Sequence, residues 1–179
     1  MKSNIMLSEA KHLRLFFRSR SSDDGDSSSL SKMTIPKIAV HNRQRKISLN
    51  VAELENFAGQ ALQHSLQLHQ PQQTDLRKLS EIFIWLISDR RMALLHQKFL
   101  GQSGPTDVMT FQHGELFISV DTARRHAQAF ENSLLRELKL YIVHGLLHLH
   151  GFDDQTPSEA HNMKDAQERI LTVCSGAAS

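Results

Sequence analysis

The residues best suited to metal chemistry in this sequence lie close together, at His144, His148 and Asp154. Residues four apart on a helix share a face, so His144 and His148 can present two imidazole nitrogens to one ion. Gly151 can adopt a positive φ and end the helix, which turns the chain so that Asp154 can reach the same ion. Three protein ligands leave the fourth zinc position open to water, as in catalytic sites. The spacing therefore predicts one Zn²⁺ ion, with metal-bound water at the His144/His148 site as the catalytic group.

Two alternatives for these histidines remain open. A pair at this spacing also occurs by coincidence, but here it lies in a segment that is apolar on nearly every side of the expected helix. Imidazoles without partners would carry a desolvation penalty there. His150 is expected to point away from the pair. His161, on the following helix, is the spare candidate for third ligand if Asp154 is not used.

The spacing of this segment is similar to the metal-binding portion of the metzincin proteases, with one difference. In those proteases a glutamate follows the first histidine and acts as the general base that activates water. Gly145 occupies this position here. The sequence therefore keeps the ligand geometry and disfavours peptide hydrolysis.

Apolar periodicity predicts the elements that must position these residues. Strands are expected near residues 38–40, 81–87, 106–111 and 115–120, with 81–87 central and the last two joined as a hairpin or adjacent strands through 112–114. Helices are expected near residues 51–68, 89–99, 122–130, 134–150 and 157–173. The predicted fold class is α+β, a small mixed β-sheet of about four strands packed with about five helices, with the metal site on a core helix.

Local signals mark several boundaries of these elements. Asn50 can cap the first helix, and Ser88 or Asp89 the second. The segment 156–159 reads TPSE and supplies a capping box, with proline at the first helical position, for the last helix. A loop is expected at Pro71 and the glutamines beside it.

The composition limits the class of protein. A chain of 179 residues with 40% hydrophobic content suits one core, and its net charge of +2 gives no sign of a nucleic-acid partner by itself. The single cysteine, Cys174, excludes a cysteine-based zinc site or a disulfide within the monomer. No segment has the roughly 18 apolar residues of a membrane span, and no secretory signal is evident. We expect a soluble, cytoplasmic protein with no membrane partner and no small-molecule organic cofactor.

Residues 1–33 differ in character from the rest of the chain. A basic segment at 11–20 precedes a run of serine, aspartate and glycine at 21–29, which cannot offset its ordering entropy by burial. We expect 1–33 to be a disordered extension and 34–175 to form the domain. An organellar transit peptide is an alternative, although Glu9 and the acidic run fit that class poorly. A further alternative is that translation begins at Met33.

The segment from His144 to Asp154 reads HGLLHLHGFDD and resembles the signature of the YbeY family, the metal-dependent endoribonucleases of ribosomal RNA maturation. The segments GPTDVMTF (104–111) and GELFIS (114–119) also resemble family blocks, and Met163 falls where the family has a methionine. The resemblance covers about residues 36–173. It implies a zinc-dependent, single-strand-specific endoribonuclease that acts in 16S rRNA 3′-end maturation and ribosome quality control, with RNA and the small ribosomal subunit as partners.

Two departures from the family pattern bear on activity. Asp154 replaces the family's third histidine; its oxygen can coordinate zinc at a similar distance, but its negative charge makes the ion a weaker Lewis acid. Leu100 replaces an arginine expected to hold phosphate in the family, and His96 replaces an asparagine. Arg91 and Lys98 are candidate phosphate contacts in its place.

Other residues receive secondary assignments. Asp107 either orients a ligand or caps a turn, and we favour the structural role; Gly114 and Ser119 are expected to serve backbone geometry. Exposed helical charges usually serve solvation, but five basic residues are candidates for positioning an RNA backbone: Arg90, Arg91, Lys98, Arg124 and Arg125. An alternative function, favoured by Leu100, is a ribosome-binding or RNA-binding module of the same fold with weak or no nuclease activity.

Overall fold

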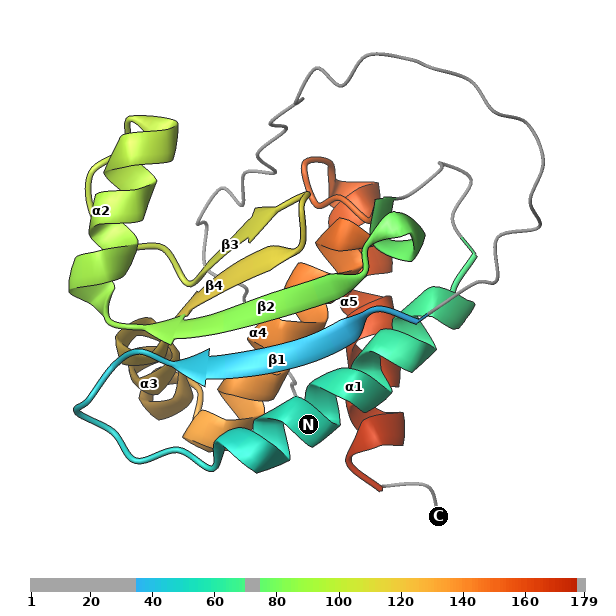
Figure 1. The fold of residues 1–179 in the computed structure, drawn as a ribbon, viewed down its shortest axis with the longest axis horizontal. Helices are drawn as coiled ribbons and strands as arrows, with labels where there is room; N and C mark the ends of the chain where they lie inside the picture. Colours follow the sequence, from blue (N-terminus) through green and yellow to red (C-terminus); the bar gives the residue numbers. More distant parts are fainter. Residues whose placement is uncertain (1–34, 70–74, 177–179) are drawn as a thin grey trace.

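A four-stranded mixed sheet organises the residues that the computed structural model describes, 35–69 and 75–176 (Figure 1). The expected extension at 1–33 and the loop at Pro71 lie outside the described residues. The strand order is β1 (Lys37–Asn42), β2 (Glu81–Ile87), β4 (Glu115–Ser119), β3 (Val108–Phe111). β1, β2 and β4 are parallel, while β3 pairs antiparallel with β4. Strand 81–87 is central and the hairpin through 112–114 is present, as predicted.

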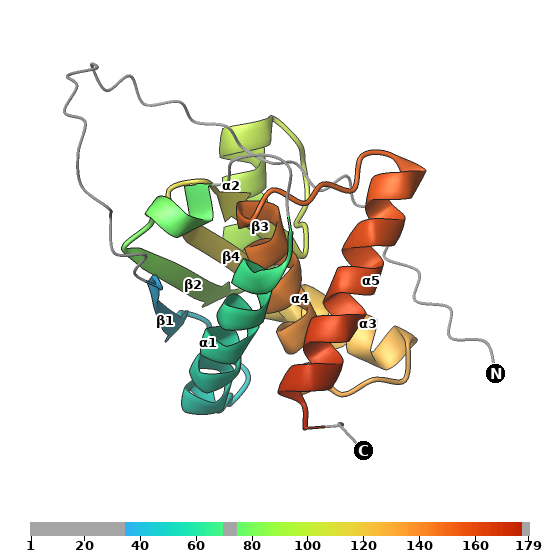
Figure 2. The ribbon, with the colours of Figure 1, turned by 90° about the vertical axis from the view of Figure 1, so that its right-hand side faces the viewer.

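Five α-helices accompany the sheet, which confirms the predicted α+β class. They are α1 (Val51–Gln67), α2 (Asp89–Leu100), α3 (Val120–Ala129), α4 (Leu134–Leu149) and α5 (Pro157–Cys174). α1, α4 and α5 lie together behind the sheet in Figure 1, and the quarter turn of Figure 2 shows them on one side of it. No helix among the described residues is both long and apolar enough to cross a membrane.

Two of the predicted helix caps are formed, whereas Ser88, at the start of α2, makes no side-chain capping hydrogen bond. Asn50 accepts the Glu53 N–H at 3.2 Å, and the capping box between Thr156 and Glu159 is formed. The third helix begins at residue 120 rather than 122 because the Ser119 side chain caps it. A short 3₁₀ helix, η1 (Asp75–Lys78), was not predicted, since one turn leaves no periodic pattern.

Two apolar clusters lie on opposite faces of the sheet. Alternate β2 residues, Ile82, Ile84 and Leu86, are fully buried against the main core formed with α1, α4 and α5. The second cluster is smaller: Met92 of α2 packs with Ile87, and residues of β3 and β4 extend it. α4 therefore lies inside the main core, while α2 covers part of the opposite face.

Candidate metal centre

His144 and His148 project from consecutive turns of α4 onto one point. Both side chains are buried, with 2% and 4% of their surface exposed. Their Nε2 atoms are 3.0 Å apart, and the two rings are nearly perpendicular at 87°. Each neutral imidazole carries one proton and one lone pair, so two facing Nε2 atoms can share a cation. The buried helix thus presents two nitrogen ligands side by side.

The end of α4 fixes the orientation of the second imidazole. Gly151 has φ of 100°, and its N–H donates to the His148 carbonyl at 3.1 Å. The chain then turns, so that the Phe152 N–H donates to the Leu147 carbonyl at 3.0 Å. This turn places the Phe152 carbonyl 3.1 Å from Nδ1 of His148. A proton on Nδ1 donated to that carbonyl leaves the Nε2 lone pair available to a metal.

The same turn carries Asp154 back toward the imidazoles. One ligand atom from each of His144, His148 and Asp154 lies within 4.8 Å of the other two. Two imidazoles and a carboxylate are ligands that zinc accepts, so the chemistry of this donor set fits a divalent cation. The structure therefore brings together the three residues predicted from spacing, and this group could hold a metal ion.

The two other histidines considered as ligands lie elsewhere. Nε2 of His150 is 2.9 Å from the Leu68 carbonyl. Burial lowers the pKa of His150, with a smaller contribution from Arg77, although the hydrogen bond to Leu68 opposes this shift. His161 is exposed and faces Asp165 at 3.4 Å. Neither belongs to the group of converging ligand atoms.

Gly145, between the two histidines, is required by packing. A Cβ atom at this position would lie 2.3 Å from Cδ2 and 2.9 Å from Cγ of Leu116 in β4. α4 therefore approaches the sheet more closely than any side chain would allow. A glutamate at this position, as in metzincins, would have no room.

Leu100, at the position of the family's expected arginine, belongs to the second apolar cluster together with Phe99. The Lys98 ammonium lies 5.2 Å from the centroid of the Phe99 ring. Arg91 is exposed in the first turn of α2. Neither basic residue is part of the group of ligand atoms. His96 is buried, and its Nδ1 lies 2.8 Å from the Gly104 carbonyl, which ties α2 to the loop before β3.

Asp107 and Gly114 have the structural roles that the sequence analysis favoured. Oδ1 of Asp107 accepts the Thr106 hydroxyl at 3.1 Å and the Val108 N–H at 2.9 Å, so it caps the turn into β3. Gly114 has φ of 100°, and a Cβ there would lie 2.7 Å from the Glu81 carbonyl. The hairpin between β3 and β4 therefore needs glycine at this position.

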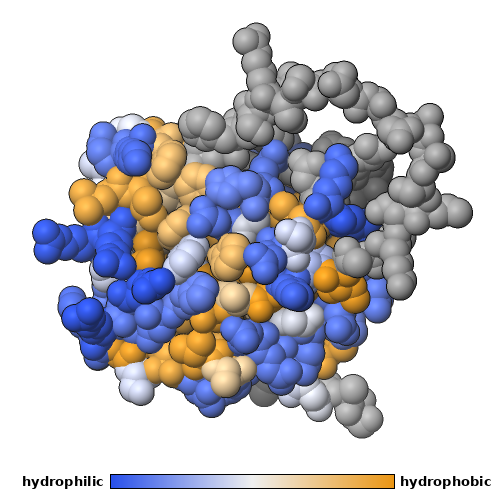
Figure 3. Space-filling view, in the orientation of Figure 1, coloured by the Kyte–Doolittle hydropathy of each residue, from blue (hydrophilic) through white to orange (hydrophobic). Residues whose placement is uncertain are grey.

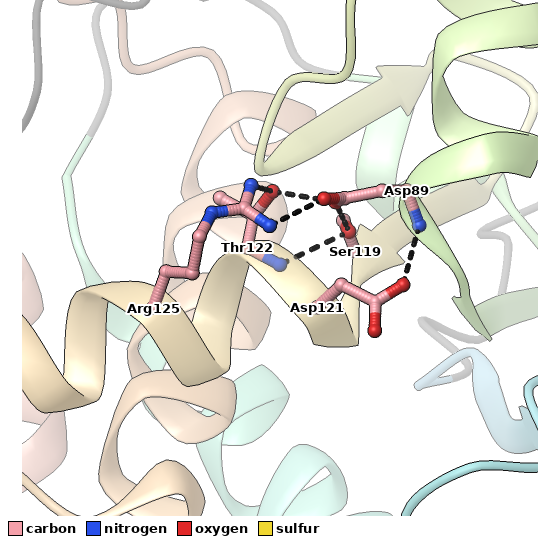
Figure 4. Close-up of polar contacts among 5 residues, drawn as sticks. All are labelled: Asp89, Ser119, Asp121, Thr122 and Arg125. Carbon is pink, nitrogen blue, oxygen red and sulfur yellow. Dashed lines mark hydrogen bonds and ion pairs between the residues drawn. The ribbon is translucent and has the colours of Figure 1, made fainter.

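A second polar cluster, centred on Asp89 at the start of α2, was not found by sequence reasoning (Figure 4). Its Oδ1 accepts the hydroxyls of Ser119, at 2.5 Å, and of Thr122, at 2.8 Å. Its Oδ2 pairs with Arg125 at 2.5 Å, and its N–H donates to Asp121 at 2.9 Å. Burial alone would raise the pKa of Asp89, but these hydrogen bonds and the Arg125 charge together lower it. The positive charge of Arg125 is therefore paired with the carboxylate of Asp89.

The fold is an α+β domain built around a buried helix, and two residues of this helix belong to a group of ligand atoms that could hold a metal ion. The family model of endoribonuclease YbeY matches residues 39–175, so the chain belongs to the YbeY endoribonuclease family. This membership supports a nuclease role.

Individual relatives agree with this assignment. Endoribonuclease YbeY of Phocaeicola vulgatus is 35% identical over 106 residues, covering 55% of this chain and 77% of that protein. The protein of the same name from Chlamydia trachomatis serovar D is 28% identical over 152 residues, covering 76% and 87%. The fold is similar to the solution structure of a Thermotoga maritima protein, with a TM-score of 0.53 and 23% identity, covering 78% of this chain and 90% of that one.

Proposed function

We propose that this chain is a zinc-dependent, single-strand-specific endoribonuclease that acts in maturation of the 16S rRNA 3′ end and in ribosome quality control. The observation that carries the proposal is the convergence of His144, His148 and Asp154 on a buried helix, in a chain of an endoribonuclease family. The substrate class is RNA, and the proposed partner is the small ribosomal subunit.

Zinc is the proposed ion because the donor set combines two imidazoles with one carboxylate. When bound, the ion would supply Lewis-acid activation of water and of a phosphoryl oxygen. The protein's part is to fix the ligands: burial on α4 limits the movement of His144 and His148, and the Phe152 carbonyl sets the tautomer of His148. Asp154 completes the set from the turn after the helix.

Binding an RNA strand requires cations, because each phosphate carries a negative charge. We propose that Arg91 and Lys98 make these contacts. Both are exposed on α2, and Leu100 leaves the position of the family's expected arginine without charge. The packing of Leu100 against the second apolar cluster supports the alternative of an RNA-binding module with weak or no nuclease activity.

The variant His148→Ala tests the endoribonuclease proposal against the binding-module alternative. His161→Ala is its matched control, because His161 is exposed and lies outside the ligand group. For the endoribonuclease, His148→Ala should lose bound zinc, measured per chain by elemental analysis, and cleavage of unstructured RNA should fall by roughly 1,000-fold or more. His161→Ala should keep both. Retained RNA binding by a zinc-loaded wild-type chain without turnover would favour the binding module instead, and cleavage that persists after chelation would contradict the proposal.

A further inference from the structure

The carboxyl ends of the three parallel strands meet at one edge of the sheet. The loop after β1, the start of α2 after β2 and the start of α3 after β4 all lie there, because parallel strands point the same way. Hydrogen bonds tie the three segments: the Arg43 N–H donates to the Leu86 carbonyl at 2.8 Å, and the Asp89 N–H to Asp121 at 2.9 Å. Figure 1 shows this edge at the opposite end of the sheet from the loop between α4 and α5, which completes the metal group.

Exposed cations gather on these three segments. We call them the basic edge: Arg43, Arg45, Lys46, Arg90, Arg91 and Arg124. Within the part of the chain that the structure describes, none of the six forms an ion pair. Figure 3 shows strongly hydrophilic side chains gathered at this end of the exposed face, at the left of the view. The net charge of the chain is only +2, with 21 Lys and Arg against 19 Asp and Glu, so attraction of a polyanion depends on a local group of cations rather than on the total charge.

The loop that carries half of the basic edge is held in one conformation by a buried side chain. Gln44 is 8% exposed, and its Oε1 accepts the N–H groups of Lys46, at 2.8 Å, and Ile47, at 2.9 Å. Its Nε2 donates to the Ile47 carbonyl at 2.6 Å. The residues on either side of Gln44 therefore extend into solvent from an ordered turn. An ordered loop loses less entropy when its side chains bind a ligand.

The carboxylates near the basic edge are engaged by other groups. Asp89 pairs with Arg125, and Asp121 accepts the Asp89 N–H. In α1, Glu53 pairs with Lys139 at 3.0 Å, and Glu55 accepts the Val40 N–H at 2.9 Å. These carboxylates therefore interact with groups other than the six exposed cations. The edge therefore presents a positive field to a polyanion.

An aromatic surface adjoins these cations on the sheet. Trp85, half-buried on β2, lies under the Arg43 guanidinium, which is 5.2 Å from the ring centroid. The His41 ring stacks on Trp85 with the centroids 4.5 Å apart. Cations beside aromatic side chains are the combination that binds single-stranded nucleic acid, through phosphate contacts and base stacking.

We propose that the basic edge binds the phosphate backbone of single-stranded RNA outside the metal centre. This inference rests on the proposed function for the choice of RNA as the ligand. The edge holds a segment of the strand away from the scissile phosphodiester, so that affinity for RNA and metal-dependent cleavage arise from different parts of the molecule. Arg43 contributes both a charge to the phosphates and an ordered contact with Trp85.

The test compares two double variants of the full chain that each remove two positive charges. Arg43→Ala/Arg45→Ala lies on the basic edge, whereas Lys37→Ala/Arg169→Ala removes exposed cations from the start of β1 and from α5. Binding of a labelled oligouridylate is measured across a series of salt concentrations. The edge variant should bind roughly tenfold more weakly, and the slope of log affinity against log salt should fall by about 1.4, or about 0.7 per lost phosphate contact. The control should bind as wild type does.

Further measurements keep the outcome unambiguous. Arg45→Ala/Lys46→Ala, which leaves the Trp85 contact intact, should give a similar loss if charge is responsible, and thermal unfolding checks that each variant folds. Loss of RNA binding by the edge variants supports the inference even if the wild-type chain fails to cleave RNA, which would sink only the proposed function. Unchanged affinity and salt slope would overturn the inference. So would a loss confined to binding of vesicles of anionic phospholipid, because the edge would then serve a membrane.

Discussion

Helices α4 and α2 lie on opposite faces of the sheet and contribute differently to the proposed chemistry. α4 is buried in the main core and presents two imidazoles whose Nε2 atoms lie 3.0 Å apart. α2 begins at the Asp89 cluster, where hydroxyls and a guanidinium surround a single carboxylate, and ends at Leu100, which packs into the second apolar cluster. The ligand atoms of the metal group converge on one point. In the Asp89 cluster, by contrast, the carboxylate oxygens accept hydrogen bonds from two hydroxyls and pair with a guanidinium.

This difference shows how the two polar clusters should be interpreted. A cluster whose hydrogen-bond donors and acceptors match one another stabilises the fold and has little left for a ligand. Two imidazole nitrogens and a carboxylate oxygen that converge are ligand atoms that one divalent cation could bind together. α4 therefore carries two of the three residues of a group that could hold a metal ion, while α2 begins at a structural cluster and has Leu100 where the family's arginine is expected. We therefore expect that metal binding and phosphate contacts can be changed separately in this chain.

The largest expected effect comes from breaking the contact that positions the histidine pair. Gly145→Ala places a Cβ atom 2.3 Å from Leu116 Cδ2, so α4 must shift away from β4. We expect a loss of about 3 kcal/mol in the free energy of unfolding, measured by urea denaturation of the metal-free chain. Zinc affinity should also fall, because the imidazoles move with the helix.

Gly59→Ala in α1 is the matched control for this change. A Cβ at Gly59 meets nothing within 4 Å, so alanine there should stabilise the helix by about 0.5–1 kcal/mol. Leu116→Ala combined with Gly145→Ala should recover part of the lost stability, because the colliding side chain is removed. If the single Gly145→Ala variant were as stable as wild type, the close approach of α4 to the sheet would be wrong.

The next largest effect concerns the third ligand. Asp154→Ala removes the carboxylate, and zinc affinity should fall by roughly 100-fold or more, since losing even an outer-shell partner costs 10- to 100-fold. Asp154→His restores the family's ligand type and should keep the zinc. Competition with a chromophoric chelator measures both affinities. Equal zinc affinity in Asp154→Ala and wild type would show that Asp154 does not bind the ion.

Sequence reasoning predicted the parts of the molecule that depend on local spacing. The strands and helices follow apolar periodicity and capping residues, and the pair of His144 and His148 follows from helical geometry alone. Asp154 was predicted because Gly151 lies at the helix end, where a positive φ turns the chain back.

The remaining features depend on contacts between residues distant in the sequence. Position 145 requires glycine because a larger residue would collide with Leu116, which is distant in the sequence. Asp89 likewise contacts Ser119 and Arg125, which lie 30 and 36 residues further along the chain. The strand order β1-β2-β4-β3 decides these contacts, and periodicity does not specify that order. The gathering of Arg43 and Arg90 at one edge has the same origin. A single sequence read by itself holds no signal for such contacts.

A smaller effect is expected from returning an arginine to the end of α2. Leu100→Arg should raise kcat/KM for unstructured RNA by about tenfold. A charge-assisted hydrogen bond to phosphate contributes roughly 1.5–3 kcal/mol, and part of this free energy is offset by the entropy lost when the arginine side chain becomes ordered. It should also lower the free energy of unfolding by about 1 kcal/mol, since Leu100 leaves the second apolar cluster. Leu94→Arg adds the same charge at an exposed position of α2 and should change neither quantity. Equal gains from both variants would mean that added charge alone, not its position, increases turnover.

The smallest expected effect tests the structural role of the Asp89 cluster. Asp89→Asn removes the ion pair with Arg125 while leaving a side-chain acceptor for the two hydroxyls. The Arg125 side chain is 56% exposed, so solvent screens the pair and the loss should be only about 0.5 kcal/mol at neutral pH. Bound zinc and RNA cleavage should be unchanged, because the cluster shares no residue with the metal group.

The pH dependence of this variant gives the sharper test. The pKa of Asp89 is lowered below its ordinary value of 3.8, so the folded state favours the charged carboxylate. Its contribution to stability is complete above that value and is lost as the pH falls through the folded-state pKa. The gap between wild type and Asp89→Asn, measured by thermal unfolding of the metal-free chains, should therefore be constant from neutral pH to about 5 and close below 3.8. A gap that widened with acid would mean that Asp89 is protonated in the folded state, and its cluster would no longer contrast with the metal group on α4.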